Sequence, residues 1–251
     1  MFIKYPKQVG FIINRFKNAG YDAYIVGGCV RDCLLKLEPK DWDITTNATP
    51  DQIKELFKGF TILPTGEKYG TITLLLYSKD KIDSYEITTF RADGVYSDGR
   101  RPEEVIFGQN ILEDLKRRDF TINAMAYNGK LVDPFDGIKD LRNKLIKTVK
   151  NPSDRFDEDR LRILRGIRFA CKYNFCITRK TLSAMKIKCV DILEKVSKER
   201  IHDELLKILE YADNRNYAQL YKLSNLWNLI FNCDINICDE ITLDKSVGYK
   251  L

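Results

Sequence analysis

Histidine is almost missing from this chain, which has one, His202, among 251 residues. A histidine-rich metal hydrolase site needs several imidazoles, and the sequence offers His202 no second one. Chemistry built on histidine is therefore nearly excluded. Any catalytic metal ion must be held by carboxylates, and oxygen ligands of that kind point to Mg2+.

Long apolar runs are missing as well. The mean hydropathy is −0.34, and no stretch has the length of a transmembrane span. The first residues, Met-Phe-Ile-Lys-Tyr-Pro, lack the basic start and apolar core of a signal peptide, so we expect a cytoplasmic protein. The seven cysteines are odd in number and show no CxxC spacing. We therefore expect reduced thiols rather than zinc ligands or disulfides.

Positive charge is concentrated in the second half of the chain. The whole sequence has 42 Lys and Arg against 36 Asp and Glu, a net charge of +6, and residues 160–210 alone hold 13 basic and 6 acidic side chains. A basic helical segment beside a near-neutral one suits an RNA or DNA backbone. A solvated lysine-rich surface has the same composition, so charge alone leaves both interpretations open.

Hydrophobic periodicity divides the chain into an α+β part and a helical part. The first part has β-rich runs at 24–26, 71–76 and 82–89 and helical patterns at 7–19, 28–36, 50–58 and 110–117. After Pro152 the pattern is helical throughout, at 157–174, 178–187, 198–211 and 214–223. We predict an α+β head at 1–150 followed by a helical extension.

Two aspartates separated by one residue are the first candidate for chemistry. Asp41-Trp42-Asp43 is predicted to begin a short strand that continues into Ile44-Thr45-Thr46. Alternation along a strand puts residues i and i+2 on one face, so both carboxylates point the same way. Divalent cations relieve the repulsion between such charges, and a two-metal site holds its ions about 3.5–4 Å apart. A lone pair of this kind also occurs in many loops and surfaces.

A glycine turn lies just upstream, in Gly27-Gly28-Cys29-Val30-Arg31-Asp32. Gly27 and Gly28 let a backbone approach phosphate closely, and a helix that starts there offers free N–H groups to an anion. Arg31 near the first turn adds a charged hydrogen-bond donor. The alternative is a tight turn with a surface arginine. Before an aspartate pair, the turn suggests a nucleoside triphosphate together with a metal ion.

Several motifs in one order resemble class II tRNA nucleotidyltransferases, which are the CCA-adding enzymes and their relatives, the bacterial poly(A) polymerases. The motifs lie at residues 27–32, 41–48, 86–91, 117–124, 133–137 and 158–162. The resemblance implies a polymerase-β-type nucleotidyltransferase head with a small, mainly antiparallel or mixed sheet. It also implies an all-helical neck at 151–211 and the start of a helical body at 212–251.

The resemblance assigns a metal site to the head. It implies that Asp41 and Asp43 bind two Mg2+ ions and that Glu86 is a third acidic residue near them. One ion would lower the pKa of the primer's 3′-OH, and the other would neutralise the triphosphate. Gly28 and Arg31 would bind the nucleotide. A different strand register would turn Glu86 to solvent.

Asp119 has two interpretations. It fits an N-cap or first-turn acid, because an apolar run with a helical pattern follows it. The resemblance implies that Asp119 recognises the ribose hydroxyls of the nucleotide, with Arg118 and Asn123 assisting and the triphosphate within their reach.

Asp159 and Arg162 are predicted to lie on one helix at i,i+3, where the default interpretation is an ion pair worth a few tenths of a kcal/mol. The resemblance implies that the pair is a protein template for the incoming base. C and A carry an amino group beside an unprotonated ring nitrogen, so a carboxylate accepts from the first and a guanidinium donates to the second. U and G present a carbonyl and an N–H there and are mispaired.

Arg168 projects into the apolar stripe of the same predicted helix, between Leu161 and Leu164. A guanidinium there needs phosphate or an acidic side chain as a partner. By resemblance, Arg165 or Arg168 reaches the triphosphate.

Residues 91–107 are rich in Gly, Asp, Arg and Pro and predict a long mobile loop. The loop resembles the flexible segment of enzymes able to add the terminal A, which disfavours a CC-only enzyme. Its candidate residues are Arg91, Asp93, Tyr96, Asp98, Arg100 and Arg101. An A-adding enzyme, a bacterial poly(A) polymerase and an RNA-binding relic without activity stay open as alternatives.

The resemblance thus implies template-independent addition of CMP and AMP to the 3′ end of tRNA, from CTP and ATP, with no membrane partner. Length is the one departure, because class II enzymes usually continue well past 251 residues. The recognisable neck ends at about residues 207–211, so the sequence is either a compact natural form or ends early.

Overall fold

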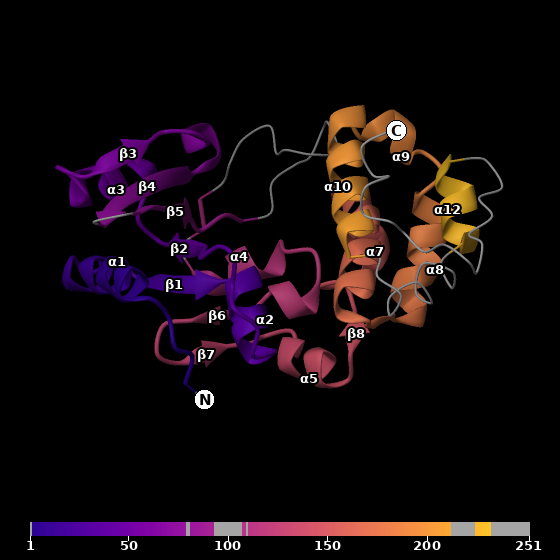
Figure 1. The fold of residues 1–251 in the computed structure, drawn as a ribbon, viewed down its shortest axis with the longest axis horizontal. Coiled ribbons are helices and arrows are strands. Elements are labelled where there is room, and N and C mark those ends of the chain that lie inside the picture. The colour runs from indigo at the N-terminus through magenta and orange to yellow at the C-terminus, as the bar shows by residue number, and fades with distance from the viewer. Residues whose placement is uncertain (1, 79–80, 93–106, 109, 212–223, 232–251) are drawn as a thin grey trace. The chain divides into compact units, whose positions relative to one another are not determined.

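The computed structural model describes residues 2–78, 81–92, 107–108, 110–211 and 224–231 (Figure 1). The chain divides into two compact units. We call them the head unit, whose described residues run up to Asn143, and the helical unit, which starts at Lys144. The domain boundaries expected at residues 150 and 211 stay predictions.

The head unit contains five helices and seven strands in its described residues. The helices are α1 (Lys7–Asn18), α2 (Gly28–Leu34), α3 (Pro50–Leu56), α4 (Ile111–Lys116) and α5 (Gly137–Arg142), with single 3-10 turns η1 (Glu67–Tyr69) and η2 (Thr121–Asn123). The strands are β1 (Ala23–Val26), β2 (Ile44–Thr46), β3 (Thr61–Leu63), β4 (Thr71–Ser78), β5 (Lys81–Thr89), β6 (Ala126–Tyr127) and β7 (Leu131–Val132).

The seven strands form one mixed sheet in the order β3-β4-β5-β2-β1-β6-β7. Strands β2 and β5 pair in parallel, and all the other neighbours are antiparallel. Helices and a largely antiparallel sheet in one unit make this an α+β fold. The predicted fold class is confirmed.

Strands β4 and β5 form the longest ladder, with Ile72 opposite Ile87 and Thr73 opposite Glu86. Ile72 and Ile87 are buried, and Glu86 is exposed. This is the period-2 alternation expected of a half-buried strand. The strands predicted at 71–76 and 82–89 are confirmed.

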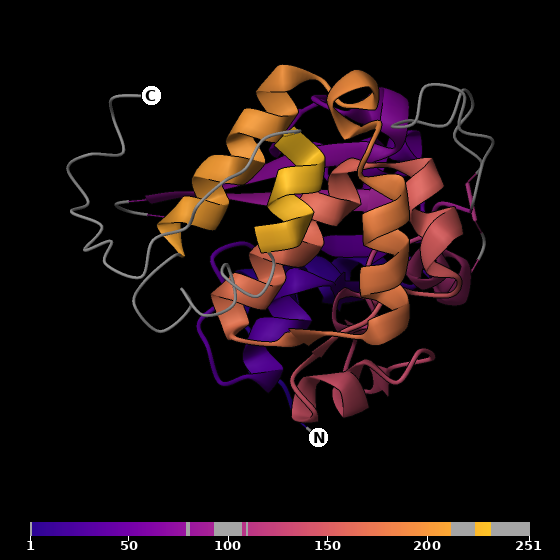
Figure 2. The ribbon, with the colours of Figure 1, turned by 90° about the vertical axis from the view of Figure 1, so that its right-hand side faces the viewer.

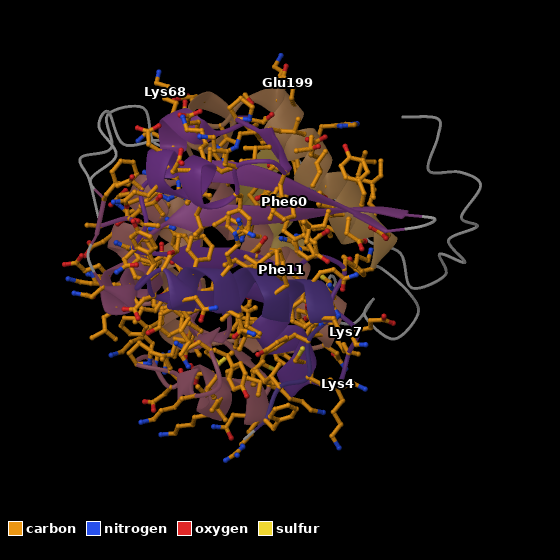
Figure 3. All side chains as sticks on the ribbon, turned by 90° about the vertical axis from the view of Figure 1, so that its left-hand side faces the viewer. Lys4, Lys7, Phe11, Phe60, Lys68 and Glu199 are labelled. Atoms are coloured by element: carbon orange, nitrogen blue, oxygen red, sulfur yellow. The ribbon has the colours of Figure 1, made fainter. Side chains whose placement is uncertain are left out.

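Helix α1 is amphipathic and buries Val9, Ile12, Ile13 and Phe16. Its outer side carries Phe11, whose ring centroid lies 5.7 Å from that of Phe60 (Figure 3). Aromatic side chains thus continue from the core to the exposed side of α1.

Two local predictions in the head are wrong. Strand β2 begins at Ile44, so Asp41 and Asp43 precede the strand instead of lying within it. The apolar run after Asp119 is the single 3-10 turn η2 and not an α-helix, because the chain enters β6 at Ala126. Apolar periodicity cannot distinguish a buried 3-10 turn from a helix over so few residues.

The helical unit contains α6 (Pro152–Glu158), α7 (Leu161–Tyr173), α8 (Arg179–Lys188), α9 (Ile192–Lys195), α10 (Lys198–Glu210) and α12 (Ser224–Phe231). It also contains two short strands, β8 (Leu145–Ile146) and β9 (Cys176–Ile177), which pair in parallel. The expectation of helix throughout after Pro152 is therefore wrong at β9. Figure 2 shows these helices from the side.

One continuous helix was expected over 157–174, and the structure breaks it at Asp159. Asp159 has φ −154° and ψ 108°, which is extended backbone, and it separates α6 from α7. The apolar side chains of α7, including Ile163, Leu164 and Ile167, enter one core with Met185 and Ile201. Phe156 of α6 belongs to the same core, so the helices on both sides of the break contribute to it.

In the described part of the chain, no helix is both long and apolar enough to cross a lipid bilayer. Cys29, Cys33, Cys171, Cys176 and Cys189 are free thiols. Burial raises the pKa of Cys29 and of Cys171 to about 12. These two thiols therefore stay protonated near neutral pH and are poor nucleophiles.

Candidate active site

Asp43 immediately precedes β2 and lies next to Glu86 on β5. The N–H of Val26 donates to the Asp43 carbonyl oxygen at 3.0 Å, which extends the β1–β2 ladder to Asp43. Ile44 pairs with Ile87 in parallel, so Asp43 and Glu86 are the residues that precede this pair on the two strands. The parallel register therefore brings the two carboxylates together although 43 positions separate them in the sequence.

Burial raises the pKa of the Asp43 carboxyl, and the charges of Glu86 and Asp41 raise it further. Arg118 and Arg31 act in the opposite direction. Two acidic and two basic side chains thus act on the Asp43 carboxyl at this end of the sheet. Electrostatic coupling of this kind is a mark of functional sites as well as of structural ion pairs.

The donor set fits Mg2+. Among the described residues no group of three or more His, Cys, Asp and Glu converges closely enough to hold a metal ion with protein ligands alone. Mg2+ does not require such a cage, because one or two carboxylates usually bind it together with waters and substrate phosphates. Asp41 and Asp43 match that smaller set, and a divalent cation would relieve the repulsion among the carboxylates.

Gly27 is required at the turn between β1 and α2 for two reasons. Its φ is +76°, in the region that favours glycine. A Cβ added there would lie 2.7 Å from Nη1 of Arg118. The N–H of Gly27 also donates to the Met125 carbonyl oxygen at 3.0 Å. Gly27 therefore lets the Arg118 guanidinium lie directly against the backbone at the start of α2, one residue before Gly28.

Arg31 is a buried residue, with 5% of its surface exposed. Its Nε donates to Oδ1 of Asp32 at 2.9 Å, and its Nη1 donates to Oδ1 of Asn123 at 2.5 Å. Nδ2 of Asn123 in turn donates to Oδ1 of Asp119 at 3.0 Å. The alternative of a surface arginine is wrong. Hydrogen bonds join Arg31, Asn123 and Asp119, three of the predicted nucleotide-binding residues.

Asp119 is buried and does not cap a helix. Its Oδ1 accepts a hydrogen bond of 2.7 Å from the N–H of Phe120, its own neighbour. The N-cap of η2 is Phe120, and no side chain caps that turn. The interpretation of Asp119 as an N-cap or first-turn acid is therefore wrong.

Arg118 shares a fully buried carboxylate, Asp114, with Arg117. Nη2 of Arg118 lies 3.1 Å from Oδ2 of Asp114, and Nη2 of Arg117 lies 2.6 Å from Oδ1. Burial alone would raise the pKa of Asp114, but the two guanidiniums outweigh it and lower the pKa to about 2. Nε of Arg118 is buried without a hydrogen-bond partner among the described residues. Arg118 thus keeps donor capacity for an anion.

The 133–137 motif supports the turn that carries Asn123, a role that sequence reasoning missed. A Cβ on Gly137 would overlap the carbonyl oxygen of Thr121. The Thr121 hydroxyl donates to Oδ2 of buried Asp140 at 2.7 Å. Asp133 accepts from the N–H groups of Gly137 and Ile138 at 2.7 and 2.9 Å. The glycine at residue 137 was the sequence feature that could have indicated this close packing.

In the helical unit, Asp159 and Arg162 have different partners. Oδ2 of Asp159 accepts from Nη2 of Arg200 at 2.8 Å. Nη1 of Arg162 donates to Oε2 of Glu158 at 2.5 Å and to the Arg155 carbonyl oxygen at 3.0 Å. The default interpretation of an intrahelical Asp159–Arg162 pair is wrong, because Asp159 lies in extended backbone before α7.

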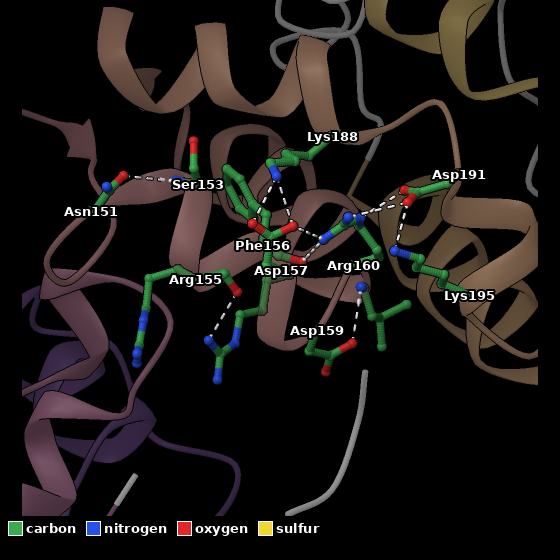
Figure 4. A network of polar contacts seen from close by, with 12 residues as sticks. Asn151, Ser153, Arg155, Phe156, Asp157, Asp159, Arg160, Lys188, Asp191 and Lys195 are labelled. Carbon is green, nitrogen blue, oxygen red and sulfur yellow. Dashed lines mark hydrogen bonds and ion pairs between the residues drawn. The ribbon is translucent and has the colours of Figure 1, made fainter. Parts of the chain in front are cut away.

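Arg160 anchors the junction between α6 and α7 (Figure 4). Its guanidinium donates to the Phe156 carbonyl oxygen at 2.5 Å, to Asp157 at 2.8 Å and to Asp191 at 2.7 Å. The hydrogen bond from Arg160 lowers the pKa of Asp191 to about 2 against its burial, and Lys195 assists. Arg160, the residue after Asp159, is therefore tied to Asp191, the residue that precedes α9.

Arg168 has an acidic side chain as its partner. This is one of the two kinds of partner that the sequence predicted, the other being phosphate. Its Nε donates to Oε1 of Glu204, which is buried. The guanidinium carbons of Arg168 and Arg165 lie 4.3 and 5.6 Å from the ring centroid of Phe169. The contact of Arg165 or Arg168 with a triphosphate stays a prediction.

Of the loop predicted at 91–107, the structure describes residues 91–92 and 107. Arg91 forms a β-bridge with Phe107, and its N–H donates to Oδ1 of Asp114 at 3.4 Å. Asp93, Tyr96, Asp98, Arg100 and Arg101 lie outside the described residues. Arg91 thus links the start of the loop to the buried carboxylate that holds Arg117 and Arg118.

Comparison with known proteins decides the family. Residues 23–147 match the family model of the poly A polymerase head domain, and residues 174–232 match that of the probable RNA- and SrmB-binding site of polymerase A. The CCA-adding enzyme of Lactobacillus delbrueckii subsp. bulgaricus is 46% identical over 206 residues. The chain belongs to the CCA-adding enzyme and bacterial poly(A) polymerase family. The resemblance seen in the sequence motifs is confirmed.

Other members of this nucleotidyltransferase family agree in sequence and in fold. The CCA-adding enzyme of Enterococcus faecalis is 46% identical over 205 residues, 81% of this chain and 49% of that protein. The Bacillus stearothermophilus CCA-adding enzyme in complex with CTP superposes with a TM-score of 0.76 at 35% identity, over 87% of this chain and 51% of that one. The Thermotoga maritima CCA-adding enzyme complexed with tRNA_CCA has a TM-score of 0.73 at 28% identity, over 92% and 54%.

The chain spans about half the length of the curated relatives it matches, 50% of the Lactobacillus delbrueckii enzyme over 81% of its own residues.

Proposed function

We propose that this chain catalyses template-independent addition of CMP and AMP to the 3′ end of tRNA, using CTP and ATP. The observation that carries the proposal is the hydrogen-bonded series Arg31–Asn123–Asp119 beside Arg118 and the carboxylate pair. It combines cations for a triphosphate, a buried carboxylate for a ribose and aspartates for Mg2+. The 46% identity to CCA-adding enzymes supports the same reaction.

The metal part of the proposal rests on Asp41 and Asp43, with Glu86 nearby. Bound Mg2+ ions would supply charge neutralisation and a lowered pKa at the attacking 3′-OH. Asp43 would hold its ligand oxygens just before β2, where the hydrogen bond from the Val26 N–H fixes its backbone. Arg118 would meet phosphate charge with the guanidinium that lies against Gly27. Positioning and electrostatics account for most of the catalysis of phosphoryl transfer.

Sugar selection would come from Asp119. A carboxylate that accepts hydrogen bonds from the 2′- and 3′-hydroxyls favours a ribonucleotide over a deoxyribonucleotide. Asn123 holds the Asp119 carboxylate in place through its amide, and Arg31 holds Asn123. The buried series therefore gives Asp119 one orientation.

Base selection would come from Asp159 and Arg162. The carboxylate accepts from the amino group of C or A, while the guanidinium donates to the neighbouring ring nitrogen. U and G leave both groups mispaired, and each good paired contact discriminates by about 1–3 kcal/mol. The same two residues would serve C and A in turn, since both bases share this donor–acceptor pattern.

Nucleotide addition to defined tRNA ends tests the proposal. The protein is incubated with Mg2+, each NTP separately, and tRNA transcripts that end before CCA, after C or after CC. We expect CTP addition to the first two transcripts and ATP addition to the third. Addition of A alone to transcripts ending in CC would indicate an A-adding enzyme, and long A runs on unrelated RNA a poly(A) polymerase. Retained tRNA binding without incorporation would indicate a relic.

A further inference from the structure

Arg200 contacts the proposed template carboxylate although no sequence motif includes it. It lies in the first turn of α10, and its Nη2 donates to Oδ2 of Asp159 at 2.8 Å across 41 residues. The two side chains are 18% and 16% exposed. A part-buried contact of this kind restricts side-chain motion more than an exposed ion pair does.

The Asp159 carboxylate is held at both oxygens. Oδ1 accepts from the N–H of Leu161 at 3.0 Å, and Oδ2 accepts from Arg200. Two donors from different elements set the plane of the carboxylate. Each carboxylate oxygen has two acceptor positions, so both retain capacity for the amino group of a base. Held in this way, Asp159 does not lose rotamer freedom when a base binds.

Arg162 is held independently of Asp159. Glu158 and the Arg155 carbonyl oxygen accept from its Nη1. Opposite charges three residues apart would otherwise tend to pair with one another. Separate counter-ions, Arg200 for the carboxylate and Glu158 for the guanidinium, keep the two groups apart and available to a base.

We propose that Arg200 is a positioning residue for base selection, which orients the Asp159 carboxylate to accept from the amino group of C or A. This inference rests on the proposed function of Asp159 and Arg162. Arg200 does not touch the base in this role. It acts through Asp159, and its loss frees the carboxylate to rotate or to pair with Arg162.

The test compares Arg200→Ala and Arg200→Lys with wild type in single-nucleotide addition to tRNA transcripts. We expect Arg200→Ala to raise KM for CTP and ATP about tenfold and to raise UTP incorporation relative to CTP by about tenfold, with kcat changed less. Arg200→Lys should restore part of the selectivity, because an ammonium still donates to Oδ2. Lys198→Ala, an exposed change in the same helical turn, is the matched control.

A double-variant cycle separates positioning from folding. In an Asp159→Asn background, adding Arg200→Ala should leave the UTP/CTP ratio unchanged, since the group on which Arg200 acts is already altered. A merely structural role would lower the melting temperature and slow all four nucleotides alike. Unchanged UTP/CTP selectivity in Arg200→Ala, or full additivity in the cycle, would overturn the inference. A wild-type protein that does not prefer C and A would overturn the proposed function and this inference with it.

Discussion

Nη1 of Arg31 donates a hydrogen bond of 2.5 Å to Oδ1 of Asn123, a residue 92 positions further along the chain. The bond sets the orientation of the Asn123 amide, whose oxygen faces the guanidinium and whose NH2 faces Asp119. Both residues are buried, at 5% and 6% exposure. Helix α2 and turn η2 are thereby joined at the proposed ribose site.

Asn123→Ala should remove this junction. The change leaves the buried Arg31 charge with one partner fewer, so we expect a loss of about 1–3 kcal/mol in the free energy of unfolding, measured by urea denaturation. We also expect the preference for CTP over dCTP to fall, because Asp119 loses its amide donor. Asn128→Ala, at an exposed position, is the control. An unchanged CTP/dCTP ratio would remove Asn123 from ribose recognition.

Gly27→Ala should abolish most nucleotide addition. The backbone at Gly27, with φ +76° and ψ −121°, is one that residues with a Cβ rarely adopt, and the new Cβ displaces Arg118 from its place against the backbone. Gly20→Ala is a matched control, since Gly20 has φ +83° but no atom within 4 Å of an added Cβ. Equal activity in the two would show that the place of Arg118 does not matter.

Acid should destabilise the head through Asp114. Its pKa is lowered from 3.8 to about 2 in the folded chain, so its contribution is complete above the unfolded pKa and is lost as the pH falls from about 4 to 2. The linked stability is about 2 kcal/mol, from roughly 1.4 kcal/mol per pKa unit. Asp114→Asn should flatten that part of the stability curve, measured by denaturation at each pH. A wild-type curve that stays level below pH 4 would contradict the ion-pair assignment.

Asp43→Ala should abolish incorporation of every nucleotide while tRNA binding survives. Loss of one of two metal-holding carboxylates removes charge neutralisation at the reacting phosphate. Incorporation and filter binding of the same tRNA provide the two measurements, and EDTA added to wild type should reproduce the result. Asp51→Ala, an exposed aspartate on α3, is the control. Incorporation that persists in Asp43→Ala would refute the metal assignment.

Local patterns of apolar residues in the sequence predicted much of the fold. The strands at 71–76 and 82–89 and the helices of the first 60 residues followed from apolar spacing. These signals are local, because neighbouring residues determine which faces are apolar. The order of short motifs was enough to indicate the family.

The arrangement of the site was not local. Asp159 leaves the helix without a proline or glycine to signal it, because Arg160, Asp191 and Phe156 hold the junction through tertiary contacts. The sequence left a surface position open for Arg31, and only the structure shows it buried, with hydrogen bonds to Asp32 and Asn123.

The sequence by itself determined the fold class, the family and the kinds of side chain that the reaction needs, since these depend on periodicity and on motif order. The tertiary structure alone decided the partners of those side chains: Asn123 for Arg31 and Arg200 for Asp159. The physical reason is that hydrogen bonds and ion pairs act over a few ångströms in space. Residues 41 to 92 positions apart become neighbours when the chain has folded.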